Sequence, residues 1–213
     1  MKRAIIGHWQ TVPAIGQLAV DNKIEAYNFS QGTLVHWFRA LAGHKLGVFT
    51  DIGLETFLDP RQLGGKLNDV TKEDLVKLIE VEGHEQLFYP TFPVQVAFLR
   101  GTYADESGNI TMDEEIGPFE SISVAQAVHN CGGKVVVQVK DVVAHGSLDP
   151  RMVKIPGIYV DDVVIAAPED HQQTYDCQYD PSLSGEHRAP EGAADEVLPM
   201  SAKKIIGRRG AWN

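Results

Sequence analysis

The stretch EAYNFSQGTLVHWFRALAGHKLGVFTD, residues 25–51, contains a strand, a helix and a second strand in succession. Ile24 to Asn28 is short and mostly apolar, as a buried strand would be. Between Thr33 and His44 the apolar side chains recur at spacings of three and four, which predicts an amphipathic helix ending near Gly43. Val48 to Asp51 is then the next strand. This alternation is typical of an α/β fold.

The alternation continues on both sides of this stretch. We expect, in chain order, a strand at Arg3 to Ile6, a helix near Ala14 to Asn22, a hairpin around Glu82 and Gly83, a strand at Val94 to Leu99, a helix at Ser121 to Asn130, and strands at Lys134 to Val139 and Ile158 to Ala166. The sequence therefore predicts a mostly parallel sheet flanked by helices over residues 1–167. Beyond Pro168 the composition becomes polar, so we expect residues 168–213 to be a solvated linker or arm and the start of a truncated second domain.

Charge and hydropathy exclude several classes of protein. The 213 residues carry a net charge of -10, and the basic residues are scattered, so nucleic-acid binding is not expected. No apolar run reaches the length of a membrane span, and no secretory signal is visible, so a cytoplasmic protein is expected. Cys131 and Cys177 lie far apart without metal-binding spacing and are interpreted as free thiols.

The common catalytic motifs are absent. No GxGxxG follows a strand, no phosphate loop is complete, and no GxSxG elbow is present. The acidic pair Glu114 and Glu115 could lie near a site, since a carboxylate in a closed pocket can transfer protons. Surface acids without a function are the alternative. No histidines are paired at metal spacing, so no metal site is expected.

One connection is unusually long. Residues 51–69, DIGLETFLDPRQLGGKLND, contain glycines and a proline but no periodicity. Connections in compact domains are mostly shorter, and a loop of this length is usually functional or disordered.

Five segments stand out in order along the chain: AYNFSQGTLVHWFRALA, GLETFLDPRQLGGKLNDVT, FLRGTYADESGN, AQAVHNCGGKVVVQV and LDPRMVKIPGIYVD. They resemble the successive motifs of the family I coenzyme A transferases, and more closely those of the single-chain bacterial acetate or short-chain acyl-CoA transferases. The resemblance extends from about Gly7 to Gly185. The fold that it implies is related to that of the phosphosugar isomerases.

The resemblance also implies a covalent chemistry. A glutamate attacks the acyl-CoA, forms a mixed anhydride and becomes a glutamyl-CoA thioester, which a second carboxylate then resolves. Coenzyme A is thus a substrate, and no permanently bound cofactor is expected. The family's glutamate lies in a second α/β half, and an earlier unit carries a "GGF"-type loop. Neither segment has a match here, so we expect the chain to be incomplete at both ends and to contain no catalytic residue.

Gln31 matches the glutamine of the family's "PQG" motif, which positions the carboxylate in the site. A neutral amide suits that task, because it donates a hydrogen bond without adding a charge. The alternative is a helix-start residue that faces solvent. Ser30 replaces the family's proline and could cap the following helix instead.

The long loop matches the family's "GLGTFVDPR", which forms a wall of the acyl pocket. Gly53, Thr56 and Phe57 would be its substrate-binding residues. Glu55 replaces a family glycine. This departure adds a side chain and a charge where the backbone normally packs closely, and it makes the shape of the loop an open question.

These observations favour one part of an acyl-CoA:carboxylate CoA-transferase that is inactive alone. Its ligands would be an acyl-CoA and a small carboxylate, and its partner a second copy or a complementing carboxy-terminal half. The alternatives are one subunit of a split transferase, or a truncated non-catalytic product that retains only assembly surfaces.

Overall fold

The first two strands form a small parallel sheet. In the computed structural model, which describes residues 1–188, 190 and 199–210, β1 (Arg3–Ile6) pairs with β2 (Glu25–Asn28). The connection between them contains a short 3-10 turn (Trp9–Thr11) and α1 (Pro13–Val20). Parallel strands need such a crossover. Ala19 of α1 packs on Ala4 and Ala26 of the two strands, which fixes the helix on the sheet.

The central helix, α2 (Gln31–Ala42), confirms the predicted periodicity and begins two residues earlier than expected. Ser30 caps it, because its side chain accepts a hydrogen bond from the Thr33 backbone N–H at 3.3 Å. Its buried positions include Trp37 and Leu41, one turn apart. The helix ends at Gly43, as its sequence indicates.

The predicted hairpin is present beside α2. Strands β3 (Gly47–Thr50), β4 (Lys77–Val81) and β5 (His84–Pro90) form an antiparallel sheet in the order β3-β5-β4. The turn between β4 and β5 contains Glu82 at φ 50° and Gly83 at φ 80°, and two such residues are what a tight hairpin requires.

The second half of the chain contains a three-stranded parallel sheet in the order β12-β9-β6. Its strands are β6 (Val96–Arg100), β9 (Lys134–Val139) and β12 (Asp162–Ile165), and α3 (Ser121–Asn130) contacts β6 and β9. The inward side chains of β9 are fully buried in the main core. The predicted strand at Ile158 to Ala166 is shorter than expected, because its first residues lie in a 3-10 turn (Gly157–Tyr159).

A small mixed sheet in the order β10-β7-β8-β11 was not predicted. Its strands have only two or three residues each, too few for an alternating pattern to be recognised. They are β7 (Tyr103–Asp105), β8 (Ile110–Thr111), β10 (Asp141–Val143) and β11 (Val153–Ile155).

The first part of the expected linker is docked on the fold. After a 3-10 turn (Pro168–Asp170), His171 is buried, with 8% of its surface exposed. Arg100 donates to the Gln172 carbonyl at 2.7 Å, and Gln138 donates to the Asp170 carbonyl at 2.9 Å. The backbone carbonyls of this part thus accept hydrogen bonds from side chains of the sheet. The division at residue 167 stays a prediction, and residues 189, 191–198 and 211–213 lie outside the described part. A last helix, α4, covers Ala202–Gly210.

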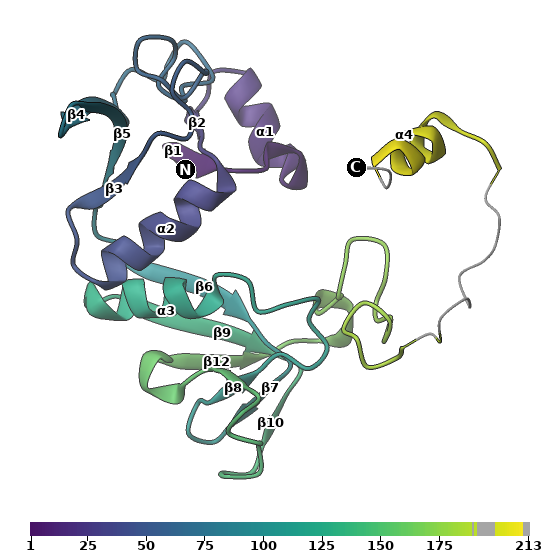
Figure 1. Cartoon of the computed structure of the whole chain (residues 1–213). Helices are drawn as coiled ribbons and strands as arrows, with labels where there is room; N and C mark the ends of the chain where they lie inside the picture. The colour runs from purple at the N-terminus through teal and green to yellow at the C-terminus, as the bar shows by residue number, and fades with distance from the viewer. Residues whose placement is uncertain (189, 191–198, 211–213) are drawn as a thin grey trace.

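Helices α2 and α3 lie side by side and join the two parallel sheets (Figure 1). Asn130 at the end of α3 donates to the carbonyl of Ala42 at 2.7 Å. Ala127 of α3 belongs to the same core cluster as Trp37 and Leu41 of α2. Among the described residues β1 pairs only with β2, and β6 only with β9, so each has one edge without a strand partner.

We predict that the chain self-associates, because open strand edges and exposed apolar side chains favour contacts between copies. Phe98 on the edge strand β6 is 82% exposed. Phe98→Lys should therefore shift the chain toward monomer in analytical ultracentrifugation. Val20→Lys on α1, where the side chain is 75% exposed, is the matched control and should have no such effect. A wild-type chain that stays monomeric at high concentration would contradict the prediction.

Candidate functional site

Gln31, the residue expected to position a carboxylate, is already paired with one. It is the first residue of α2, and its side-chain Nε2 donates to Glu120 Oε1 at 2.9 Å. The side chain of Gln31 also lies close to Gly7, because a Cβ added at Gly7 would be only 2.5 Å from Gln31 Oε1. The side chain is exposed, as in the alternative interpretation, but it is held between two other segments. Gly7 follows β1 and Glu120 precedes α3, so the site lies where parallel strands end and helices begin.

Glu120 is the site residue that the sequence did not reveal. It occupies the N-cap position of α3, yet its side chain makes no capping hydrogen bond and reaches Gln31 instead. The preceding residue, Phe119, has φ 41°, a left-handed conformation that costs energy for a bulky residue and is often found near functional sites. No local pattern could have identified Glu120, because its partner is 89 residues away.

The long loop is ordered by a buried carboxylate. Asp59 is 1% exposed and accepts hydrogen bonds from the backbone N–H of Glu55 at 3.0 Å and from that of Arg61 at 2.9 Å. The guanidinium of Arg61 lies 2.8 Å away. Its hydrogen bonds hold the pKa of Asp59 well below the usual range of a carboxyl group. The loop is therefore fixed by its own side chains rather than disordered.

The three expected pocket residues lie in the turn that Asp59 closes. Thr56 Oγ1 donates to the Gly53 carbonyl at 2.7 Å. Gly53 has φ 106°, and an added Cβ would lie 3.0 Å from Leu58 Cδ1, so its side-chain-free backbone is required. Phe57 is 41% exposed. Its aromatic ring is thus available to a ligand, and its role in a pocket stays a prediction.

Glu55 has φ 62°, in the left-handed region that favours glycine. Its carboxylate is exposed and has no hydrogen bond or ion pair within the part of the chain that the structure describes. The glutamate therefore keeps the backbone conformation of a glycine position at an energetic cost.

We predict that Glu55→Gly raises the free energy of unfolding by about 1 kcal/mol, because it relieves the left-handed strain of a residue with a Cβ. Urea denaturation followed by circular dichroism measures the change. Glu55→Ala is the control and should give no gain, since alanine retains the Cβ. Equal gains in the free energy of unfolding in both variants would show that the effect comes from removing the charge of Glu55 and that the backbone strain is absent.

Glu114 and Glu115 lie in a different cluster, which holds the docked arm. The Glu115 side chain is 8% exposed and accepts from Arg100 at 3.3 Å and from the hydroxyl of Thr102. Glu114 pairs with Lys140. Their described contacts include neither Gln31 nor the loop. His171 of the arm approaches Glu115, and burial, followed by the nearby Arg100 charge, lowers the pKa of its imidazole.

A groove of 970 Å³ runs between α2 and β3. At one end it is lined by Ser30 and Gly32, on either side of Gln31, and by Ile52, the neighbour of Gly53. The groove therefore opens where the Gln31 segment and the long loop meet. Across the described residues, no group of three or more His, Cys, Asp or Glu side chains could hold a metal ion. In the same part of the chain, no helix is both long and apolar enough to cross a membrane.

Comparison with known proteins identifies close relatives. The chain is 42% identical over 212 residues to the acetate CoA-transferase YdiF of Escherichia coli K12, a match that covers all of this chain and 40% of YdiF. It is 45% identical over 200 residues to the caffeate CoA-transferase of Acetobacterium woodii, covering 93% of this chain and 38% of the relative. The crystal structure of the acyl-CoA transferase YdiF of E. coli O157:H7 in a thioester complex with CoA superposes with a TM-score of 0.87, at 42% identity, over 98% of this chain and 41% of YdiF.

The chain thus spans about 40% of the length of these two curated relatives. The model of the family described as coenzyme A transferase matches residues 1–166, most of the sequence. The α/β architecture and the order of the motifs agree with that match. The chain belongs to the coenzyme A transferase family.

Proposed function

We propose that this chain supplies the carboxylate-positioning part of an acyl-CoA:carboxylate CoA-transferase, which moves CoA between a short-chain acyl-CoA and a carboxylate through a glutamyl-CoA thioester. The observation that carries the proposal is the hydrogen bond from the Gln31 amide to the Glu120 carboxylate at 2.9 Å. A side chain that holds one carboxylate in an exposed position has the chemistry to hold another. The names of the two curated relatives above, an acetate and a caffeate CoA-transferase, support the reaction class.

The Gln31 amide can serve two carboxylates at once. It has two N–H donors, of which Glu120 takes one in the described contacts. The second N–H is left for the carboxylate or the oxyanion of the reaction. Gly7 leaves room for Oε1, because a Cβ added there would lie 2.5 Å from that atom, and the hydrogen bond to Glu120 orients the amide. A preorganised donor stabilises developing negative charge without reorganising during the step.

The nucleophilic glutamate would come from a segment that has no match in this chain. The length of the relatives supports that view, because this chain corresponds to 40% of YdiF. A complementing carboxy-terminal segment, or an oligomer in which copies meet at the site, would then complete the enzyme. Coenzyme A acts as a substrate in this proposal, with Gly53, Thr56 and Phe57 lining the acyl pocket and no permanent cofactor taking part.

We predict that the isolated chain does not exchange CoA between acetyl-CoA and labelled acetate, because none of its residues matches the family's nucleophile. Radiolabel exchange into acetyl-CoA measures the reaction. The wild-type chain should give only the rate of label exchange that is measured in buffer without protein. Turnover that Glu55→Gln abolishes would contradict the proposal and would make the loop carboxylate the nucleophile.

We predict that Gln31 acts once the enzyme is complete. In a chimaera, residues 1–166 of this chain replace the matching segment of the E. coli acetate CoA-transferase, and Gln31→Ala should lower kcat by roughly 100- to 1,000-fold, the loss typical of one oxyanion donor. The matched control is Gln17→Ala, because Gln17 is an exposed glutamine that also donates to a carboxylate, that of Asp21, at 2.8 Å.

Gln17→Ala should leave the rate of the chimaera unchanged. An unchanged rate in Gln31→Ala, with an active parent chimaera, would remove Gln31 from the site. An inactive parent chimaera would instead count against the assignment of this segment to the reaction.

A further inference from the structure

We propose that the arm, residues 168–188, is a pH-sensitive strap: neutral His171 holds it on the end of the parallel sheet, and protonation of His171 releases it. This role of the arm is separate from the proposed function and does not depend on it. Three observations carry it: the hydrogen bond that the His171 ring accepts, the charges that face the ring, and the polar nature of the contacts that dock the arm.

The His171 ring accepts a hydrogen bond that only its neutral form can accept. Gln138 of β9 donates from Nε2 to the Asp170 carbonyl at 2.9 Å, and the same nitrogen lies 3.1 Å from His171 Nδ1. An amide nitrogen can only donate, so Nδ1 is the unprotonated acceptor and the ring proton is on Nε2. A proton on Nδ1 would place two donors face to face. Turning the Gln138 amide would set its oxygen against the Asp170 carbonyl, so the arm loses a hydrogen bond in either case.

The surroundings of the ring favour its neutral form. His171 is 8% exposed, and burial, followed by the charge of Arg100 on β6, lowers the pKa of its imidazole. Glu115 and Glu114, which follow β8, act in the opposite direction, and Glu115 Oε1 is 3.9 Å from His171 Nε2. Both carboxylates are already paired with cations, Glu115 with Arg100 and Glu114 with Lys140. They therefore offset only part of the cost of a buried imidazolium.

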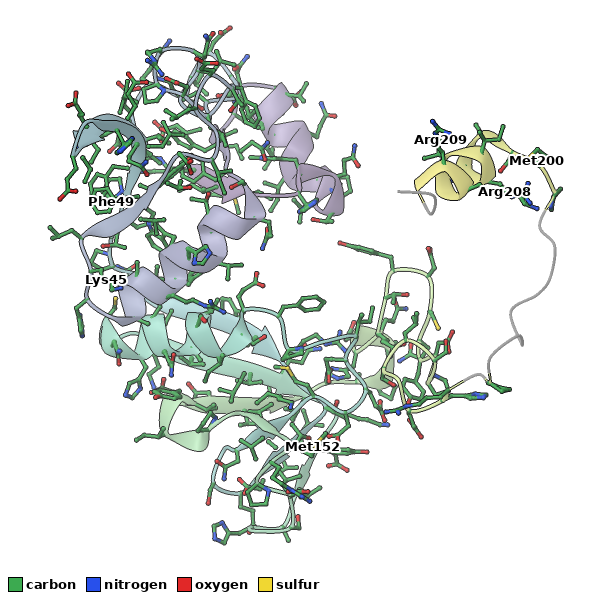
Figure 2. All side chains as sticks on the ribbon, in the orientation of Figure 1. Lys45, Phe49, Met152, Met200, Arg208 and Arg209 are labelled. Carbon is green, nitrogen blue, oxygen red and sulfur yellow. The ribbon has the colours of Figure 1, made fainter. Side chains whose placement is uncertain are left out.

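Hydrogen bonds, rather than apolar packing, hold the arm in place. Among the described residues, none beyond Val163 belongs to the three apolar core clusters. A cavity of 330 Å³ remains between the arm and β6, and two acids of the arm, Glu169 and Asp170, line it. The described chain beyond the arm adds no support, because Met200 and Arg208 lie well away from the arm (Figure 2). The bond between Gln138 and the ring is therefore a large part of what docks the arm.

The arm ties the second half of the chain to the first. The hydroxyl of Tyr175 donates to the carbonyl of Thr11, in the turn that precedes α1. Thr11 lies in the same connection as Gly7, which is close to the Gln31 side chain. Release of the arm thus removes one partner of the segment beside Gln31.

The direction of the pH dependence follows from the two states of the arm. In the released arm the ring has the ordinary histidine pKa of about 6.5, whereas the docked ring has a lower pKa. The stabilisation of docking by neutral His171 is therefore fully present above about pH 6.5 and is lost as the pH falls below it, because the released arm takes up the proton first. Between about pH 7.5 and about pH 5.5 the equilibrium constant for docking should fall by up to about tenfold.

Hydrogen exchange of the 213-residue chain, followed by mass spectrometry and corrected for the intrinsic exchange rate at each pH, tests the strap. From about pH 7.5 to about pH 5.5 the protection of peptides from the arm should fall by up to about tenfold, while peptides of β4 and β5 keep theirs. His171→Asn should abolish the fall, because the asparagine oxygen can accept from Gln138 and does not titrate. His187→Asn is the matched control and should behave like the wild type, since His187 is an exposed histidine of the same arm.

Three results would overturn the strap: equal protection of the arm at both pH values in the wild type, a fall that His171→Asn retains, or an equal fall in β4 and β5. If His171→Asn leaves the arm unprotected at both pH values, Gln138→Glu decides. A carboxylate accepts from the protonated Nδ1–H, so this variant should reverse the sign and protect the arm more at the lower pH. A fall in Gln138→Glu as large as that of the wild type would count against the proposal.

Discussion

The packing of α2 on α3 is the contact on which the rest of this structure depends. The two parallel sheets share no hydrogen-bonded strand pair among the described residues, so the helices hold them together. Trp37 and Leu41 of α2 share a core cluster with Ala127 of α3, and this apolar contact excludes water along both helices. At the far end the bond from Asn130 to the Ala42 carbonyl fixes the register of the pair.

That register places the two helix N-termini together and so creates the site. Gln31 begins α2 and Glu120 precedes α3, and they meet only because the helices run side by side (Figure 1). The helix N-termini carry partial positive charge, which favours a carboxylate at this position. The long loop approaches the same end through β3, and Asp59 fixes its shape. One packing contact thus accounts for the amide, its carboxylate partner and the mouth of the groove.

Local patterns in the sequence predicted the regular elements but not the contacts between them. The periodicity of α2 and the turn at Glu82 and Gly83 are local signals, and both were confirmed. The capping role of Ser30 was also foreseen, because a cap acts within one turn. Glu120 and the docking of His171 were missed, since each depends on partners tens of residues away. The resemblance directed attention to Gln31, but only the folded chain brings Glu120 to it.

The most direct test of the central claim, that the Gln31 amide binds carboxylates, is a titration of the ¹⁵N-labelled chain with acetate, followed through the side-chain amide resonances. The account predicts that the two side-chain N–H resonances of Gln31 shift saturably with acetate and have different starting chemical shifts in Glu120→Gln. The side-chain N–H resonances of Gln17, the control, should shift with acetate only as much as they do with chloride. Gln31 side-chain resonances that shift with acetate no more than with chloride would contradict the account.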